Sequence, residues 1–435
     1  MKRLVLALIA LGLAVPTSAQ VDTILPLRER APLEDSILKE RLDVVVPAEM
    51  RARGIDMWIL IAREYAEDAV VRTMLDANSF AARRRTILVF HDPGEGEPVE
   101  RFTVSRYDLA DLFESAWAPE EQPDQWARLA EIVAERDPAR IAVNISPQTA
   151  AADGLTKSQY DALMAALPDR YQARIIPAEE LAIGWLETRT ETELALYPSI
   201  VATAHELIAE AFSNAVITPG RTTADDVRWW LRQRVADLDM DVWFHPSVAI
   251  FRAGEADSLT GDTVIQPGDM LWTDFGITYL DLNTDTQQIA YVLRPGEADA
   301  PDGMKAAMAQ MLRVGDIHTA AFEAGVSGNA VLSQILEQAA AEGIDATIYS
   351  HPLGYHGHGA GPAIGFWDNQ QATPAGAYLV RPMTAWSVEY KIDAPVPEWG
   401  GQVVPFRSEE DGWFDGETFR YLDGRQTSFH LIGSE

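Results

Sequence analysis

The sequence contains no cysteine and carries few positive charges for its length. The absence of cysteine from 435 residues excludes disulfide bonds and lipid attachment at a signal cysteine, so the stability of the fold must come from its core. Lys and Arg number 35 against 66 Asp and Glu, which gives a formal net charge of −31 at pH 7. Because an acidic surface repels phosphate groups, this composition argues against nucleic acid or anionic lipid as a partner.

The sequence also lacks an apolar run that is long enough to span a membrane. Its longest candidate, residues 4–15, follows Lys2 and Arg3 and is too short to cross a bilayer. Small residues follow at 17–19, so the sequence predicts a signal peptide over residues 1–19 that is cleaved before Gln20. A retained anchor is the alternative. We therefore expect a periplasmic or secreted protein that has no membrane contact after cleavage.

The remaining chain of about 415 residues is too long for a single core and predicts two domains. Over residues 20–186, strand-like apolar runs alternate with helical patterns, which is typical of an α/β domain. The expected strands are 57–62, 86–90, 141–144 and 174–176, and the expected helices are 35–53, 124–135 and 157–166.

The character of the chain changes near residue 187. Thr190 and Glu193 have the spacing of a capping box, which predicts the start of a long helix to about residue 216. Further helices are expected at 223–238, 303–324 and 329–342, and strands at 247–251, 269–276, 285–293, 378–391 and 402–414. We therefore predict a second, α+β domain over residues 187–435.

Two aspartates in neighbouring predicted strands are the first candidate site residues. Asp274 lies within one strand, and Asp285 begins the next one eleven residues later. If the strands form a hairpin, alternation of side chains brings both carboxylates to one face of the sheet. Taken alone, the pair is better explained as two ordinary turn aspartates in a β-hairpin, which are common.

A cluster of histidines follows further along the chain. His351, His356 and His358 lie within eight residues, with glycines at 354, 357, 359 and 361. Glycine lets the backbone approach a bound group closely, so the pattern indicates a binding site. A metal-scavenging tract on the surface is the alternative.

Two glutamates complete the set of candidate residues. Glu389 lies in an apolar strand, where an unpaired charge would be costly. Glu409 shares a strand face with Arg407 by alternation, and Glu410 faces the other way unless a bulge exchanges the two glutamates. The order Asp, Asp, His, Glu, Glu provides hard oxygen donors and one imidazole, a set that suits two adjacent divalent metal ions.

With these residues in place, the chain from about residue 187 onward resembles the M24 metallopeptidases. This family includes Xaa-Pro aminopeptidase, prolidase and methionine aminopeptidase, and it has the "pita-bread" fold. Its ligands run in the same order with the same gap of eleven between the aspartates. Gly357-His358-Gly-Ala-Gly361, Ser-Val-Glu389 and Arg407-Ser-Glu409 resemble its ligand motifs. Residues 20–186 are similar to the creatinase-like α/β domain of the Xaa-Pro aminopeptidase, prolidase and creatinase branch.

The resemblance implies two divalent metal ions, Mn, Zn or Co, and assigns roles to individual residues. The implied metal ligands are Asp274, Asp285, His358, Glu389 and Glu409. Glu389 would also move a proton to the leaving nitrogen, and a second histidine, His351 or His356, would polarise the scissile carbonyl. A homodimer is implied as well.

Three departures from the family pattern affect the expected site. His351 and His356 are one residue further apart than the corresponding pair of the family, so His356 competes with His358 as the ligand. The segment 253–262 lacks the histidine that contacts substrate in the family, and Trp367 stands where the family has a later histidine. These departures bear on substrate handling rather than on metal binding.

The expected function is hydrolysis of the Xaa-Pro bond at the amino terminus of a peptide substrate. A prolidase that acts on Xaa-Pro dipeptides is the nearest alternative. An amidohydrolase of the creatinase type works without metal, and the presence of all five ligand residues argues against it. The alternative outside enzymes is a non-catalytic peptide-binding protein with the same fold.

Overall fold

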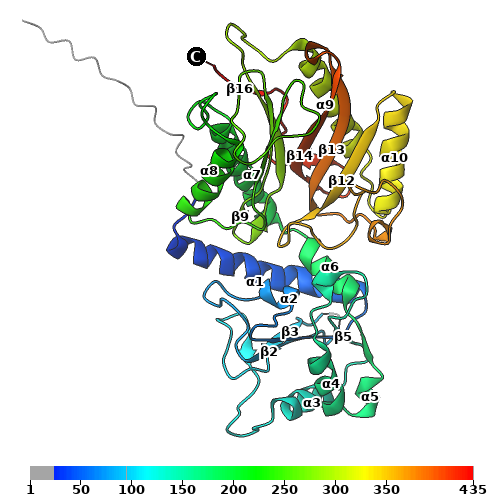
Figure 1. The fold of residues 1–435 in the computed structure, drawn as a ribbon. Coiled ribbons are helices and arrows are strands. Elements are labelled where there is room, and N and C mark those ends of the chain that lie inside the picture. Colours follow the sequence, from blue (N-terminus) through cyan, green and yellow to red (C-terminus); the bar gives the residue numbers. More distant parts are fainter. Residues whose placement is uncertain (1–23, 95, 435) are drawn as a thin grey trace, which may run out of the picture.

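The computed structural model describes residues 24–94 and 96–434, and the predicted signal peptide lies outside these residues. The chain forms two units stacked end to end, each built around its own sheet (Figure 1). Among the helices of the described part, none is both long and apolar enough to cross a membrane.

The amino-terminal unit is a mixed six-stranded sheet between two layers of helices. Its strand order is β4-β3-β2-β1-β5-β6. The strands are β1 (Met57–Arg63), β2 (Arg85–His91), β3 (Glu100–Thr103), β4 (Glu114–Ser115), β5 (Ile141–Val143) and β6 (Ile175–Pro177). The helices are α1 (Leu27–Ala52), α2 (Ala69–Arg72), α3 (Gln125–Arg136), α4 (Lys157–Ala166), α5 (Asp169–Gln172) and α6 (Glu179–Glu187).

Alternation along β1 explains why this sheet is covered on both sides. Trp58 and Leu60 belong to the core beneath α1 and α6, whereas Met57 and Ile59 belong to the core beneath α3 and α4. Since both faces of the strand are buried, its sequence is a continuous apolar run without polar alternation.

The carboxy-terminal unit is a larger sheet that is antiparallel along its main path. The strand order is β12-β13-β14-β11-β8-β7, with β15 beside β14 and β16 parallel to β11. The strands are β7 (Ser247–Phe251), β8 (Met270–Phe275), β11 (Thr286–Val292), β12 (Ala346–Leu353), β13 (Thr384–Val396), β14 (Gln402–Phe414), β15 (Phe419–Tyr421) and β16 (His430–Ile432). A small hairpin, β9 (Thr278–Tyr279) and β10 (Leu282–Asn283), joins β8 to β11.

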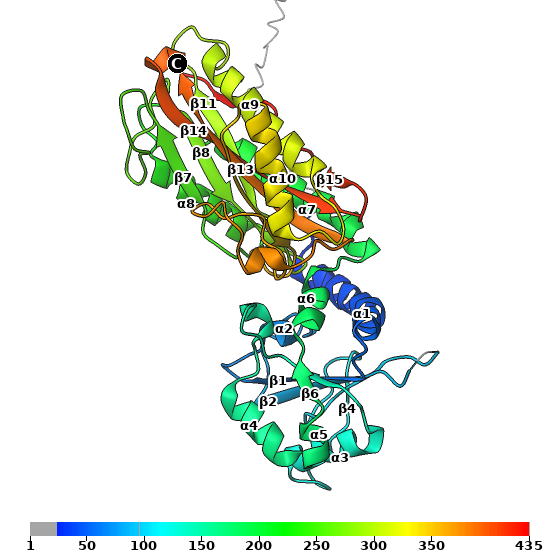
Figure 2. The ribbon, with the colours of Figure 1, turned by 90° about the vertical axis from the view of Figure 1, so that its right-hand side faces the viewer.

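Four helices cover this sheet, two on each face (Figure 2). They are α7 (Glu191–Ala211), α8 (Ala224–Asp237), α9 (Asp302–Ala320) and α10 (Gly328–Ala341). Leu271 of β8 packs with α7 and α8, and its neighbour Trp272 packs with α9 and α10. Residues of β8 with the parity of Trp272 therefore share the face that α9 and α10 cover.

Most of the expected elements are present, but helix α1 begins at Leu27 rather than at residue 35, and several short elements, among them α6 and β3, were not predicted. Three further differences lie in the carboxy-terminal unit. The predicted capping box is confirmed, but α7 ends at Ala211 rather than near residue 216. The strand expected from residue 378 begins only at Thr384, after Met383 adopts a positive φ of 58°. The strand β12 was not predicted, because the histidine cluster at its end was interpreted only as a binding site and was assigned to no element.

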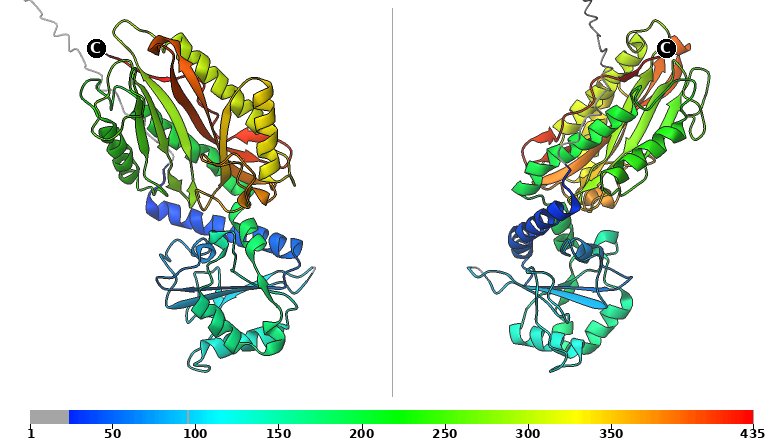
Figure 3. Two further views of the ribbon diagram at one scale, coloured as in Figure 1. Left: turned by 45° about the vertical axis from the view of Figure 1, so that its right-hand side comes forward. Right: turned by 90° about the vertical axis from the view of Figure 1, so that its left-hand side faces the viewer.

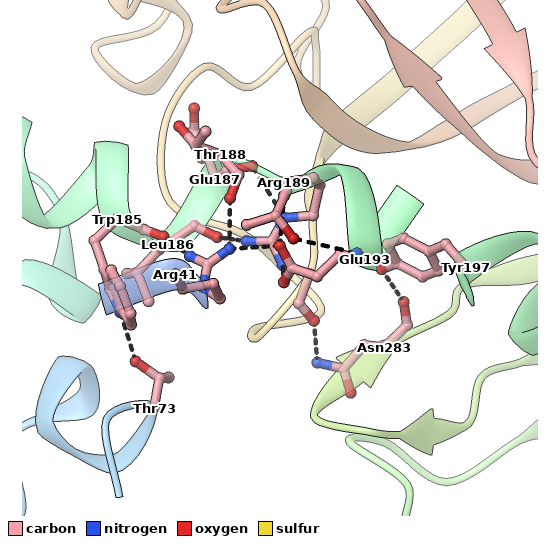
Figure 4. A network of polar contacts seen from close by, with 12 residues as sticks. Arg41, Thr73, Trp185, Leu186, Glu187, Thr188, Arg189, Glu193, Tyr197 and Asn283 are labelled. Atoms are coloured by element: carbon pink, nitrogen blue, oxygen red, sulfur yellow. Dashed lines mark hydrogen bonds and ion pairs between the residues drawn. The ribbon is translucent and has the colours of Figure 1, made fainter. Parts of the chain in front are cut away.

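A buried polar network joins the two units where α1 and α6 lie between them (Figures 3 and 4). Glu193 of α7 accepts from Arg41 of α1 at 2.7 Å and from Arg189 at 2.9 Å. Both guanidinium groups also lie over the ring of Tyr355, at 4.9 and 5.4 Å from its centroid. The hydroxyl of Tyr197 donates to the carbonyl oxygen of Asn283 at 2.5 Å. The junction thus holds the loops that precede Asp285 and His356.

Candidate metal centre

A single row of residues crosses the larger sheet and carries most of the candidate site. Direct cross-strand partners share a face of the sheet. From edge to edge, the row consists of Ser247, Asp274, Gln287, Glu409, Glu389 and Tyr349. Asp285 and His351 lie two residues along the chain from members of this row, so alternation brings them to the same face.

His351 points its Nε2 atom into the carboxylates. This atom lies 3.4 Å from Oε1 of Glu389 and 3.6 Å from Oδ2 of Asp285. Nδ1 lies 3.0 Å from the carbonyl oxygen of Pro352, which can accept only if Nδ1 carries the proton. Nε2 therefore presents a lone pair. Asp285, His351 and Glu409 each offer one ligand atom, and these atoms all lie within 4.8 Å of one another.

The four carboxyl groups of the centre are buried close together. Burial raises the pKa of Asp274, Asp285, Glu389 and Glu409 well above the ordinary value, and repulsion among neighbouring carboxylates adds to the shift. Within the described part of the chain, no Lys or Arg forms an ion pair with any of the four, and the histidine within ion-pair distance of two of them, His351, is neutral because burial lowers its pKa to about 4. Such a group of carboxylates cannot be fully ionised in a buried site unless a cation compensates it.

The carboxylate oxygens and the imidazole nitrogen of this centre fit a divalent metal ion as ligands. Oδ1 of Asp274 and Nε2 of His351 are buried and have no hydrogen-bond partner. A buried acceptor without a partner is costly, and coordination to a cation would satisfy both atoms. Carboxylate oxygens with one imidazole nitrogen suit Mn, Zn or Co.

The geometry bears on the predicted roles of the histidines. The prediction made His358 the ligand, with His356 as its competitor, and left His351 or His356 to polarise the scissile carbonyl. In the structure, β12 continues to Leu353, and its alternation turns His351 toward Glu389. The ring of His358 lies behind that of His351, with 4.8 Å between the ring centroids, and packs edge-on against Trp243. His351 thus occupies the position next to the carboxylates, and His358 lies further out.

An open hollow of about 670 Å³ lies next to these histidines. His356, His358 and Trp243 line it from the carboxy-terminal unit, and Arg72 and Phe80 line it from the amino-terminal unit. The glycines of the histidine cluster were predicted to allow a close approach of the backbone. At Gly357 the backbone packs against the ring of Trp243, and a Cβ atom would lie 2.1 Å from that ring. The hollow gives the histidines access to solvent from the junction of the two units.

The structure also distinguishes the two adjacent glutamates. Glu410 lies on the opposite face of β14, where its Oε2 is 2.8 Å from Nε2 of His205. Glu409 is the partner of Glu389, so no bulge exchanges the two. The carboxylate of Asp411 accepts from the backbone N–H of Asp285 at 3.1 and 3.3 Å. Sequence reasoning did not identify this contact, because it joins positions 126 residues apart.

Sequence reasoning also missed the side chains that hydrogen-bond to the glutamates. Gln287 donates to Glu389 and Glu409, Trp367 donates to Glu389, and Ser387 donates to Glu409. Alternation from Asp285 could have placed Gln287 on this face, but nothing in the sequence pairs it with β14.

Comparison with known proteins identifies the domain that carries this centre. Residues 199–409 match the model of metallopeptidase family M24. These residues form an M24 metallopeptidase domain. The predicted family is thereby confirmed, and the metal-fitting cluster of Asp285, His351 and Glu409 lies within the M24 domain. None of the curated proteins matches the chain in sequence.

Solved structures resemble the M24 domain together with the amino-terminal unit. An X-Pro aminopeptidase from Thermotoga maritima is 18% identical, with a TM-score of 0.63 over 89% of this chain and 99% of that chain. A Xaa-Pro dipeptidase from Bacillus anthracis is 18% identical, with a TM-score of 0.56 over 91% and 99%. A dipeptidase from Pyrococcus horikoshii is 16% identical, with a TM-score of 0.60 over 90% and 99%. The predicted fold class, pita-bread with an additional α/β unit, is confirmed.

Proposed function

We propose that this protein is a secreted, homodimeric M24 peptidase that uses two divalent metal ions to hydrolyse the Xaa-Pro bond at the amino terminus of peptides. The observation that carries the proposal is the buried group of four carboxylates and His351 in an M24 domain, in which Asp274 Oδ1 and His351 Nε2 have no partner. Likeness to an X-Pro aminopeptidase and to dipeptidases supports the substrate class. The predicted signal peptide supports export to the periplasm or beyond.

The residues of the centre divide into ligands and groups that act on substrate. Asp274, Asp285, Glu389 and Glu409 would hold the cations together with a histidine, for which His351 has the favourable position. When bound, divalent metals supply Lewis-acid activation of a water and of a carbonyl group. Oε1 of Glu389 accepts no hydrogen bond from Gln287 or Trp367, which both donate to Oε2. Oε1 is not held by these two donors and faces Nε2 of His351 at 3.4 Å, which suits Glu389 to carry a proton to the leaving nitrogen.

The hollow is suited to hold the substrate, and the contact between His358 and His351 connects it to the centre. His356 and His358 line it, so either can donate a hydrogen bond to the scissile carbonyl oxygen, and His356 keeps a buried Nε2 without a partner. A site rich in carboxylates attracts the free ammonium group of a peptide. The nitrogen of a proline carries no hydrogen in the Xaa-Pro bond, so a pocket can accept it without supplying an acceptor.

A specific feature of the hollow favours the second candidate, a prolidase that acts on dipeptides. Arg72 lines the hollow from α2, and among the described residues its guanidinium group forms no ion pair with a carboxylate. An unpaired guanidinium at the mouth of a substrate site can bind the terminal carboxylate of a short peptide. A dipeptide places that carboxylate closest to the scissile bond.

The deciding experiment is turnover of Xaa-Pro peptides with and without a chelator. We expect cleavage of a tripeptide Xaa-Pro-Xaa that is abolished by chelation, restored by Mn²⁺, and strongly reduced when the amino terminus is acetylated. Cleavage of dipeptides alone would favour the prolidase. Equal cleavage of acetylated and free peptides would refute the aminopeptidase function. If the metal-loaded protein cleaves no peptide, the non-catalytic peptide-binding protein remains as the explanation.

A matched variant tests the carboxylates in the same assay. Asp285→Asn removes one negative charge while keeping the size of the side chain, so we expect metal content and turnover to fall together in a folded protein. Glu410→Gln is the control. Glu410 is next to Glu409 in the sequence, but its side chain lies on the opposite face of the sheet, so its substitution should leave metal content unchanged. Full metal content in purified Asp285→Asn would contradict the proposed centre.

A further inference from the structure

Gln287 lies at the middle of the row of site residues, between Asp274 on β8 and Glu409 on β14. We propose that Gln287, fixed in one orientation by Trp272, is a positioning residue that determines which oxygen atoms of Glu389 and Glu409 face the metal ions. The inference rests on the metal-dependent function proposed above. It concerns side chains of this chain that are not ligands themselves.

The orientation of the Gln287 amide follows from its partner on one side. Nε1 of Trp272 lies 3.1 Å from Oε1 of Gln287. An indole N–H can only donate, so the atom that receives it must be the amide oxygen, and the NH₂ group must point the opposite way. Gln287 is 2% exposed and Trp272 is 9% exposed, so water does not offer either group another partner. If the amide were flipped, the NH₂ group of Gln287 would face the indole N–H of Trp272, and its oxygen would face the carboxylates of Glu389 and Glu409.

The NH₂ group has two hydrogens and two carboxylates to receive them. Nε2 of Gln287 lies 3.1 Å from Oε2 of Glu389 and 2.6 Å from Oε2 of Glu409. One neutral side chain thus bridges two buried carboxyl groups that repel each other when both are ionised. It lowers the cost of holding them together before a cation arrives.

The same contacts make the two oxygens of Glu389 unequal. Oε2 accepts a second hydrogen bond from the indole of Trp367, at 3.1 Å. Oε1 receives neither of these donors and lies 3.4 Å from Nε2 of His351. The hydrogen bonds from Gln287 and Trp367 therefore occupy Oε2 of Glu389, so that Oε1 is the oxygen available to a metal ion. Without Gln287, the carboxylate of Glu389 could rotate and offer either oxygen.

The experiment measures metal affinity of the full chain by titration with Mn²⁺, together with kcat and KM at saturating Mn²⁺. Gln287→Met keeps the length of the side chain and removes both donors. We expect Mn²⁺ affinity to fall about 10- to 100-fold, the range known for groups that orient metal ligands. We expect kcat to fall and KM for peptide to stay near that of the wild type, because Gln287 does not line the hollow.

A double-mutant cycle separates orientation from packing. Trp272→Phe keeps an aromatic ring and removes only the N–H that fixes the amide, so we expect a smaller loss of Mn²⁺ affinity in the same direction. This loss should vanish in the Gln287→Met background, because there is no amide left to orient. Trp386→Phe is the control: its buried indole donates to Thr384 at 2.7 Å, and its loss should leave affinity unchanged.

The outcomes distinguish this inference from the proposed function. Wild-type Mn²⁺ affinity in folded Gln287→Met would overturn the role of Gln287 while leaving the metal centre intact. Equal losses from Trp272→Phe in both backgrounds would show that Trp272 acts through packing, and would overturn the orientation argument. Absence of Mn²⁺ binding by the wild type would overturn both the proposed function and the inference that rests on it.

Discussion

Replacing Glu193 by glutamine should destabilise the protein far more than its isosteric shape suggests. Its two oxygens accept from Arg41 at 2.7 Å, from Arg189 at 2.9 Å and from the backbone N–H of Thr190 at 2.7 Å. The side chains of Glu193, Arg41 and Arg189 are all 0% exposed. Burial raises the pKa of Glu193, but the two guanidinium groups outweigh that effect and keep it below the ordinary value. The group is therefore a buried anion between two buried cations.

The expected loss follows from the charge that remains after the substitution. Glutamine leaves two buried guanidinium groups without a counter-ion and turns an NH₂ group toward one of their donors. Breaking a buried ion pair in this way costs about 3–5 kcal/mol. Urea unfolding followed by tryptophan fluorescence measures it, since buried Trp185 stacks against Tyr355 and lies beneath Arg41.

A surface pair in the amino-terminal unit provides the control. Asp161→Asn breaks an ion pair with Lys157 in which both side chains are more than half exposed, at 57% and 82%. Exposed pairs of this kind contribute at most about 0.5 kcal/mol. If Glu193→Gln also changed the free energy of unfolding by less than about 1 kcal/mol, the reasoning from buried charge would be refuted.

Three further predictions concern the histidines and Arg72. His351→Ala should lose bound metal, whereas His358→Ala should keep metal and lose turnover; metal analysis of both purified variants checks this, and the opposite pattern would restore the sequence prediction. Burial lowers the pKa of His205, but its contacts with Glu410 and another carboxylate outweigh burial and raise it to about 9. The raised pKa of His205 stabilises the folded protein by about 3 kcal/mol, an effect that is complete below pH 6.5 and lost as pH rises through 9. The free energies of unfolding of the wild type and of His205→Asn should therefore converge above pH 9. A constant difference between the two at every pH would contradict this prediction. Arg72→Gln should raise KM about tenfold for Xaa-Pro dipeptides and less for longer peptides; equal changes for both lengths would exclude a role in binding the terminal carboxylate.

The sequence predicted the elements well wherever a local signal was present. The capping box of Thr190 and Glu193 opens α7 as expected, since its hydrogen bonds form within four residues. The strand β12 was missed because Pro352 and the polar residues around it have weak strand propensity. Residues 346–353 all pair with residues of β13, and this pairing outweighs the weak strand propensity of the segment.

The assignment of individual histidines depends on information that the sequence does not carry. Motif spacing favoured His358, because Gly-His-x-x-Gly matches the family pattern. The direction of a side chain depends on where its strand ends, and β12 extends through His351 and turns its Nε2 to the carboxylates. The same limit applies to Gln287, whose partner Glu409 lies 122 residues away along the chain.

The sequence by itself determined the chemistry available to this protein. Four carboxylates and a group of histidines, in the order and spacing of one metallopeptidase family, require no coordinates to recognise, because residue type and spacing are local properties of the chain. Only the tertiary structure decided which atoms meet. The register of three antiparallel strand pairs aligns Asp274, Gln287, Glu409 and Glu389 in one row. That register is fixed by packing across the whole sheet, which no short segment encodes.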